Sequence, residues 1–323
     1  MFKCGKVSGF FLFCQIFCSK VLQLLKNCVS LPQNLRKIKK EMLLEITWTA
    51  HPVIFQVGWF ALRWYALMFI VGFFIGIKIM EWIYRREGLD PERVYYLFLA
   101  TFIGTIIGAR LGHCFFYDPD YYLAHPLEIF KTWKGGLASH GGTIGVILCV
   151  LYYANKDRLS KLWLLDRLSI AVAPVACLIR MGNLFNHEIY GHETALPWGF
   201  RFIQNIPQWE RGAEPIFCNP SHPTQIYEAL AYLAVFFICW YQYKFTDAGK
   251  HRGVIFGTFM IGIFGSRFFI EYLKNVQEAF EENMLLDMGQ LLSIPFVLLG
   301  IWLVWRGLKS PAVEGYSPIV HKR

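Results

Sequence analysis

The chain has 323 residues, carries a formal net charge of +9, and is 55% hydrophobic and 17% aromatic. Only 17% of the residues are charged, and the apolar residues fall in long blocks. This pattern excludes a disordered chain, a coiled coil and a disulfide-stabilised scaffold. Most of the net positive charge, +7 of +9, lies in the first 41 residues, so the charge does not favour a nucleic-acid-binding protein either.

Residues 1–41 differ in composition from the rest of the chain. They hold eight of the 32 Lys and Arg residues, four of the nine cysteines and a single acidic residue. The segment is compatible with a signal peptide, although Phe17 stands where a small residue is expected before cleavage. It is also compatible with a basic arm on a membrane surface. We favour a third interpretation, in which the leader is not native and translation starts at Met42.

Seven apolar stretches are long enough to be considered as membrane spans, since a bilayer core needs about 20 residues of helix. Helix is the expected structure because backbone groups in lipid must be hydrogen-bonded internally. We therefore predict an all-α, polytopic membrane protein, with residues 42–323 forming one seven-helix domain. The predicted spans, of which the third is the shortest, are 58–80, 95–117, 141–154, 162–185, 226–243, 253–273 and 286–305.

The connecting segments predict the orientation. Thirteen Lys and Arg residues lie in one set of connections and five in the other, which predicts a cytoplasmic C-terminus and, with seven spans, an external N-terminus. The basic leader would then have to cross the membrane, which supports the start at Met42. The longest loop, at about 187–224, is expected on the outer side as a small head.

Ionisable residues inside the predicted spans cost at least about 2.5–3.5 kcal/mol each when unpaired at mid-bilayer, so they usually line a site. Lys78 is expected to snorkel to the cytoplasmic surface, and Asp166 with Arg167 to form an interfacial pair there. The others lie toward the outer ends of their spans, with His140 at the entry to the third: Arg63, Arg110, His113, Arg180, Arg267 and Glu271. Snorkelling explains one or two of them, and we favour a functional site in the outer leaflet for the rest. Several guanidinium groups at that depth indicate a phosphate ligand, and a phospholipid supplies one there.

Seven motifs, in this order, resemble those of the bacterial prolipoprotein diacylglyceryl transferase family. The resemblance extends over residues 50–306, and the motifs are specific as a set. They are LRWY at 62–65, GARLG at 108–112, GGLASHGG at 135–142, RMGNLFNHE at 180–188, HPTQIYE at 222–228, RFFIE at 267–271 and MGQLLSIP at 288–295. Two positions depart from the family pattern, Ile263 where tyrosine is frequent and Lys274 where arginine is common, and residues 1–41 have no counterpart.

The resemblance implies an enzyme of the bacterial cytoplasmic (inner) membrane that performs the first step of lipoprotein modification. Such an enzyme moves diacylglyceryl from phosphatidylglycerol to the lipobox cysteine in the signal peptide of a prolipoprotein, forming a thioether and releasing glycerol phosphate. Its implied partners are that lipid, that precursor and the bilayer, with no nucleic acid. The resemblance carries catalytic roles to His140, Arg180, Arg267 and Glu271. It carries phosphatidylglycerol binding to Arg180, Asn183, Glu188, Tyr65, Gly141 and Gly142.

The sequence leaves several residue roles open. His140 is either the base that accepts the thiol proton or a hydrogen-bonding partner of the lipid headgroup, with the two glycines after it allowing close approach. Glu188 and Glu271 are expected to orient the arginines, and Asn183 to bind headgroup oxygens rather than to cap its helix. The segment 222–228 is either a helix start capped by Thr224 or part of the site.

No metal-binding spacing is present, so neither a metal nor another cofactor is expected. Two other functions are compatible with arginines in a membrane. An anion transporter usually has related halves and a site at mid-membrane, whereas these charges lie toward the outer level. An intramembrane serine protease is poorly supported by Ser266 and His140, because no Gly-x-Ser motif is present there.

Overall fold

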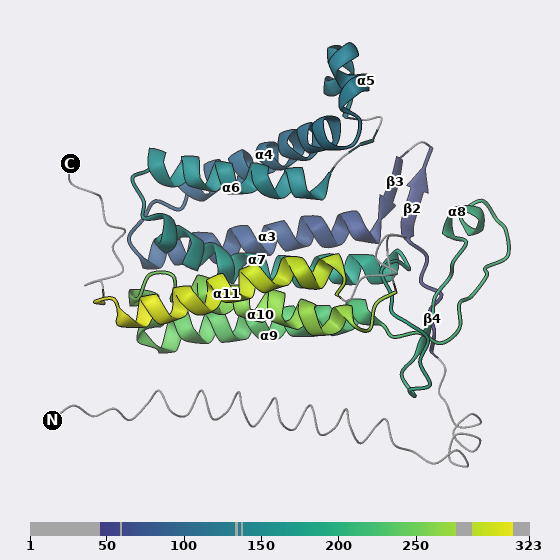
Figure 1. Cartoon of the computed structure of the whole chain (residues 1–323). Coiled ribbons are helices and arrows are strands. Elements are labelled where there is room, and N and C mark those ends of the chain that lie inside the picture. Colours follow the sequence, from purple (N-terminus) through teal and green to yellow (C-terminus); the bar gives the residue numbers. More distant parts are fainter. Residues whose placement is uncertain (1–45, 59, 133–134, 137, 276–285, 313–323) are drawn as a thin grey trace.

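The computed structural model describes residues 46–58, 60–132, 135–136, 138–275 and 286–312. The predicted leader at residues 1–41 lies outside the described residues. Seven long helices run side by side in the described part (Figure 1). They are α3 (Trp64–Arg86), α4 (Arg93–Phe116), α6 (Ser139–Lys156), α7 (Lys161–Phe185), α9 (Thr224–Phe245), α10 (Val254–Glu271) and α11 (Met288–Lys309).

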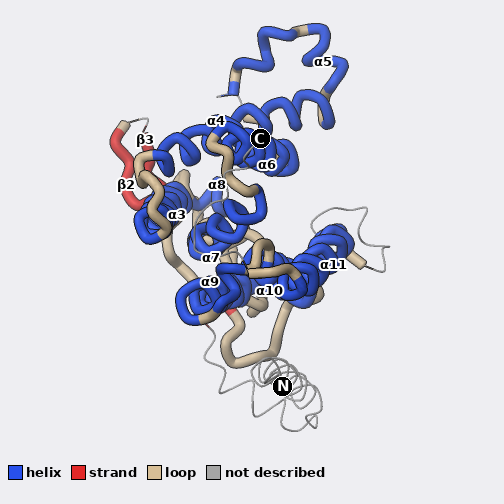
Figure 2. Tube along the Cα trace, turned by 90° about the vertical axis from the view of Figure 1, so that its left-hand side faces the viewer, coloured by secondary structure: helices blue, strands red, loops and turns tan. Residues whose placement is uncertain are grey.

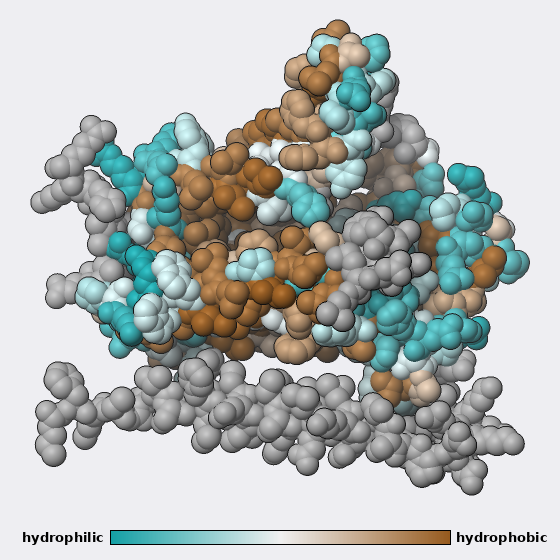
Figure 3. Space-filling view, viewed as in Figure 1, coloured by the Kyte–Doolittle hydropathy of each residue, from teal (hydrophilic) through white to brown (hydrophobic). Residues whose placement is uncertain are grey.

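Six of these helices are long and apolar enough to cross a membrane, and the short α6 is not among them. An apolar band covers the middle of the bundle in the view of Figure 3, with hydrophilic residues gathered toward both ends. Large side chains such as Ile70, Phe74 and Leu298 stay more than half exposed. A soluble protein rarely shows so large an apolar surface, so the prediction of a mostly helical, polytopic membrane protein is confirmed.

The helices form three layers when the bundle is viewed end-on (Figure 2). The pair α4 and α6 forms one layer, α3 and α7 the next, and α9, α10 and α11 the third. Helix α7 contacts α3 on one side and both α9 and α10 on the other. It therefore lies in the centre of the bundle, and its residues can reach partners in two layers.

The prediction for the first span was wrong at its start. Residues 60–63 do not begin the helix but form strand β3 (Phe60–Arg63), which pairs antiparallel with β2 (Val53–Val57). Helix α3 begins at Trp64 and continues to Arg86. An apolar run by itself does not separate a short strand from the first turns of a helix. The other six spans agree with their helices to within a few residues at each end.

Helices α4 and α6 meet along a line of glycines. A Cβ on Gly145 would collide with the backbone carbonyl of Gly104, and one on Gly141 with that of Gly108. Small residues let the backbones of membrane helices approach closely, which favours their packing through van der Waals contact. Gly141 therefore has a packing role, whereas a Cβ on Gly142 would meet its nearest atoms of α4 only at an ordinary contact distance of 3.5 Å.

One end of the bundle is closed by a buried network. Arg167 of α7 donates from Nε to Oε1 of Glu87, 2.9 Å away, at the end of α3, and the other oxygen of Glu87 accepts from Trp163. The carboxylate of Asp166 accepts from the backbone amides of Gly253 and Phe256 at the start of α10. The side chains of Asp166 and Arg167 are at most 1% exposed. Asp166 and Arg167 do form the predicted pair, at 3.8 Å, but they are buried inside the protein and also join three helices through other partners.

The segment between α7 and α9 packs against the N-terminal described residues at the other end of the bundle (Figure 1). We call residues 46–63 and 186–223 the head. Strand β1 (Ile46–Thr47) pairs parallel with β4 (Phe200–Arg201), and α8 (Ile206–Trp209) carries Glu210 to within 2.9 Å of Arg63. A small apolar cluster around Phe202 fills its interior. The remaining short elements are α5 (Pro119–Ala124) and η1 (Pro126–Phe130) between α4 and α6, and η3 (Asp247–Lys250) before α10.

His187 joins the two parts of the head. Its Nδ1 accepts from the amide of Ile203 at 3.1 Å, and its Nε2 lies 2.9 Å from the carbonyl of Ala50. The first contact needs an unprotonated Nδ1, so only the neutral ring satisfies both partners. Burial lowers the pKa of His187 below its ordinary value.

The glycine line predicts that Gly145→Leu separates α4 from α6. Because the new side chain would collide with the backbone of α4, we expect the free energy of unfolding to fall by about 1–3 kcal/mol. Thermal unfolding in detergent measures it. Gly265→Leu in α10 is the matched control, since a Cβ there meets nothing within 4 Å. An equal loss in both variants would contradict the packing role.

The lowered pKa of His187 predicts that the head weakens in acid. Below the ordinary pKa of about 6.5, the unfolded chain takes up a proton that the folded ring excludes, so stability falls as pH falls. Tryptophan-monitored unfolding between about pH 5 and pH 8 should show this slope, reduced in His187→Gln. The exposed His125 provides the control, and His125→Gln should keep the wild-type slope.

Candidate functional site

Arg180, near the C-terminal end of α7, reaches across to α9. Its Nε lies 3.0 Å from Oε2 of Glu228, and its guanidinium lies over the ring of Tyr232. One of its terminal nitrogens donates to Oδ1 of Asn183 at 3.3 Å. These three partners fix the direction of the guanidinium.

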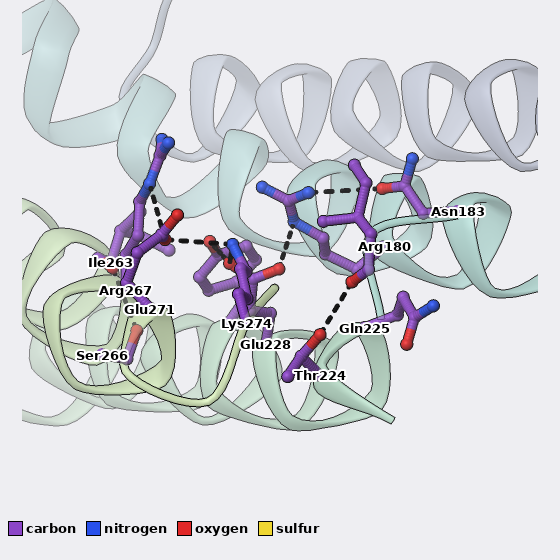
Figure 4. A network of polar contacts seen from close by, with 12 residues as sticks. Arg180, Asn183, Thr224, Gln225, Glu228, Ile263, Ser266, Arg267, Glu271 and Lys274 are labelled. Atoms are coloured by element: carbon purple, nitrogen blue, oxygen red, sulfur yellow. Dashed lines mark hydrogen bonds and ion pairs between the residues drawn. The ribbon is translucent and has the colours of Figure 1, made fainter. Parts of the chain in front are cut away.

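A chain of charges continues from Glu228 toward α10 (Figure 4). The other carboxylate oxygen of Glu228, Oε1, lies 3.0 Å from Nζ of Lys274. The same ammonium lies 3.1 Å from Oε2 of Glu271. That carboxylate lies 3.7 Å from Nε of Arg267, one turn earlier on α10. The charges alternate in sign from Arg180 to Arg267, so every like-charged neighbour is separated by an opposite charge.

The centre of this chain is closed and its two ends are partly open. The side chain of Glu228 is 0% exposed and that of Lys274 is 4% exposed. By contrast, the side chain of Arg180 is 19% exposed and that of Arg267 is 36% exposed. Within the described residues, Nε of Arg267 is buried without a hydrogen-bond partner. Two partly exposed guanidinium groups, each with more N–H donors than its carboxylate partner uses, are chemically suited to bind an anion.

A second branch begins at Asn183. Its amide donates at 2.8 Å to Oε1 of Glu188, which also accepts from Asn186. The residues on either side of Glu188 have left-handed backbones, with φ of 57° at His187 and 61° at Ile189. Such conformations are costly for non-glycine residues and persist where the surroundings enforce them. The expected role of Glu188 in orienting an arginine would therefore act through the amide of Asn183.

The first turn of α9 holds this strained turn in place. Gln225 donates from its amide to the carbonyl of Glu188, and Thr224 donates from its hydroxyl to the carbonyl of Ile189, both at 2.7 Å. Of the two alternatives left open for residues 222–228, a helix start capped by Thr224 is not found, because α9 begins at Thr224 and Pro223 is the capping residue. The hydroxyl of Thr224 instead donates to the carbonyl of Ile189, in the strained turn around Glu188.

Tyr65, in the first turn of α3, packs against Gly182 of α7. A Cβ at Gly182 would lie 2.8 Å from Cδ2 of the tyrosine ring. The ring can approach α7 this closely only because the glycine has no side chain. Gly182 precedes Asn183, so Tyr65 lies beside the branch that leads to Glu188.

His140 lies on a helix that carries none of the residues of this cluster. It is exposed in the first turn of α6, and no hydrogen bond or ion pair recorded for the described residues joins it to Arg180 or Arg267. Gly141 and Gly142, which follow it, face α4. The three positions therefore belong to the α4–α6 layer, while the charged chain belongs to α7, α9 and α10.

Two arginines that were expected near the site have other partners. Arg110 is buried and donates to four carbonyls of the connection before α6, those of Glu128, Ile129, Gly135 and Gly136. Arg63 pairs with Glu210 of the head. Fewer of the predicted charged residues therefore come together than expected. Arg110 instead holds the backbone of the segment that leads to His140.

The cluster contains no metal-binding arrangement. Among the described residues, no group of three or more His, Cys, Asp and Glu side chains is placed to hold a metal ion. The charged groups present are paired with one another, so the site's binding capacity lies in its guanidinium groups.

Comparison with known proteins gives the same family as the motifs. The family model of prolipoprotein diacylglyceryl transferase matches residues 52–306. The chain belongs to this family. A phosphatidylglycerol–prolipoprotein diacylglyceryl transferase of Porphyromonas gingivalis is 51% identical over 84% of this chain and 98% of its own length. Proteins of the same name from Tolumonas auensis and Chloroherpeton thalassium are 44% and 40% identical, over 82% and 84% of this chain and 98% of their own lengths.

In this member of the transferase family, the structure adds Glu228 and Lys274 to the predicted site residues. Glu228 lies within the predicted fifth span, so the presence of a carboxylate in an apolar helix was a signal that the sequence offered. Lys274 was visible only as a departure from the family pattern. Its contact with two carboxylates depends on the packing of α9 against α10.

The packing of α11 predicts an effect of Gly289. A Cβ there would lie 2.5 Å from Cδ of Glu271, so Gly289→Ala should push this carboxylate away from Lys274 and Arg267. We expect activity to fall about tenfold or more, since the contacts are charged and partly buried. Gly265→Ala is the matched control in α10. Unchanged activity in Gly289→Ala would contradict the placement of Glu271.

Proposed function

We propose that the chain transfers diacylglyceryl from phosphatidylglycerol to the thiol of the lipobox cysteine of prolipoproteins. One observation carries the proposal: two partly exposed guanidinium groups, Arg180 and Arg267, end a buried chain of alternating charges. The names of relatives up to 51% identical support the same reaction. The proposed product is a thioether, with glycerol phosphate as the leaving group.

The reaction needs what this site offers. A carbon–sulfur bond forms at the terminal glyceryl carbon, the bond from that carbon to the phosphate oxygen breaks, and the thiol proton ends on the leaving phosphate. Negative charge grows on the phosphate as the bond breaks. Fixed guanidinium groups in a water-poor site stabilise this charge without reorganising. Arg180 and Arg267 are the residues that we propose for this task.

The remaining residues are proposed in supporting roles. Glu271 orients Arg267, and Glu188 acts through Asn183, whose amide also meets Arg180. We place Asn183 and Tyr65 at the headgroup. His140 belongs to the thiol side, where a neutral imidazole accepts the proton of a thiol with a pKa of about 8.5. Gly141 brings α6 against α4 and thereby sets the position of His140, and we place Gly141 and Gly142 at the lipid headgroup, where small residues allow close approach.

We propose seven transmembrane helices, with α6 as the seventh, in the bacterial cytoplasmic membrane. The head would lie on the outer side together with the N-terminus, and the C-terminus would be cytoplasmic. The excess of Lys and Arg in the connections on the C-terminal side supports this orientation. The start at Met42, with residues 1–41 as a leader outside the native protein, remains part of the proposal.

The activity test uses the purified full-length chain with phosphatidylglycerol vesicles and a lipobox peptide. Mass spectrometry should detect a diacylglyceryl adduct on the peptide cysteine. Arg180→Lys keeps the charge but loses the two-pronged geometry of the guanidinium. We expect the rate to fall about 100-fold or more.

The matched control is Arg93→Lys, at an ion pair with Asp157 at the opposite end of α4 from Arg110. This variant should keep its activity, and both variants should unfold at the wild-type temperature. A preparation starting at Met42 tests the leader in the same assay. Full activity of Arg180→Lys would contradict its phosphate role. Absence of any adduct, combined with saturable phosphate transport into vesicles, would favour the anion transporter.

A further inference from the structure

Lys274 occupies the middle of the charged chain. It lies three residues after the end of α10, and its ammonium lies 3.0 Å from Glu228 and 3.1 Å from Glu271. Each of these carboxylates also lies within ion-pair distance of one arginine of the site, Arg180 or Arg267. Lys274 is therefore the only cation in the described cluster that contacts both carboxylates, and it does not itself need to reach a lipid.

The position of Lys274 is fixed through its backbone by the head. The amide of His192 donates to the carbonyl of Leu273 at 2.9 Å. On the other side, the side-chain amide of Asn275 donates to the carbonyl of Gly191 at 3.0 Å. Both neighbours of Lys274 are thus bonded to the segment that follows the strained turn of Glu188. Hydrogen bonds to residues 191 and 192 of the head therefore fix the backbone on both sides of Lys274, and this places its ammonium between the two carboxylates.

The charge balance explains what this ammonium does. Without it, two buried carboxylates would face each other with only the arginines to neutralise them. In a medium of low dielectric constant, each arginine would then be drawn fully onto its carboxylate. Its donors would no longer be available to an incoming phosphate. With Lys274 present, the carboxylates are already partly neutralised and hold the arginines without saturating them.

We propose that Lys274 is a positioning residue that holds Glu228 and Glu271 and, through them, sets Arg180 and Arg267 to bind one phosphate group. The proposal rests on the proposed function, since it concerns the same anion site. It assigns a role to a position at which arginine is common in the family. Both side chains offer several donors on one positive charge, so an arginine should replace the lysine here.

The test compares Lys274→Met with Lys274→Arg in the full-length chain. Methionine keeps much of the length and apolar stem of lysine but removes the charge. We expect Lys274→Met to raise the KM for phosphatidylglycerol on the order of 10- to 100-fold. The KM for the lipobox peptide should stay within about threefold of the wild type, and Lys274→Arg should restore the lipid KM to a similar range.

Lys78→Met is the matched control. Lys78 also pairs with a glutamate three residues away, Glu81, with Nζ 3.1 Å from Oε2, but on α3 and outside the cluster. The same substitution should leave both KM values unchanged. Thermal unfolding of each variant shows whether the fold is retained.

A double variant separates charge balance from a purely structural role. In Lys274→Met with Glu271→Gln, the unpaired negative charge is removed, so the lipid KM should fall below that of Lys274→Met alone. No recovery in the double variant, with equal losses in Lys274→Met and Lys274→Arg, would overturn the proposal. A wild-type lipid KM in Lys274→Met would overturn it as well.

Binding of phosphatidylglycerol to the detergent-solubilised protein, measured by native mass spectrometry, keeps the two proposals distinguishable. If the wild type forms no adduct, the proposed function fails. The binding experiment then still tests Lys274, because weaker lipid binding in Lys274→Met and normal binding in Lys274→Arg would support its role. Equal binding by all three proteins would contradict it.

Discussion

The site depends on the pairing of Glu228, a fully buried carboxylate on α9, with a cation on either side. A lone carboxylate in an apolar helix is costly, and removing one partner of a buried pair costs about 3–5 kcal/mol. Arg180 and Lys274 therefore cannot turn freely toward solvent or lipid, and α7 and the end of α10 are drawn to α9 at this level. The direction of both arginines follows from this constraint. Glu228 pairs with Arg180 directly, and Lys274, which is held by Glu228, also pairs with Glu271, the partner of Arg267.

The two ends of the bundle use buried charge differently. At the end with Arg167, the carboxylates of Glu87 and Asp166 accept hydrogen bonds from side chains and from the amides that open α10. That network is almost fully buried and joins α3, α7 and α10. At the site end, the terminal cations keep exposed surface. The same physical cost thus gives a closed network at one end and, at the other, a charged chain whose two terminal arginines stay partly exposed.

The head contributes to the site through backbone bonds and through one charged group of its own, the carboxylate of Glu188, which accepts from Asn183. The carbonyls of Glu188 and Ile189 are held by the first turn of α9, and the segment at 191–192 is bonded on both sides of Lys274. The α4–α6 layer, which carries His140, is joined internally by glycines. The groups that we propose for phosphate and for thiol chemistry therefore lie on different layers of the bundle, and the substrates would meet between them.

The sequence by itself determined the helices, because the length and apolarity of each run and the cost of unpaired backbone in lipid leave no other structure. It also indicated Arg180, Arg267 and Glu271, since charges in apolar helices are rare enough to stand out. It did not separate strand β3 from the helix after it, or place Thr224, because short apolar runs and single hydroxyls have several local solutions. Only the tertiary structure decided that Glu228 and Lys274 complete the chain, that Asp166 and Arg167 are internal, and that Arg110 binds a loop. Which charge meets which depends on how α7, α9 and α10 pack, and the periodicity of each helix alone contains no information about its neighbours.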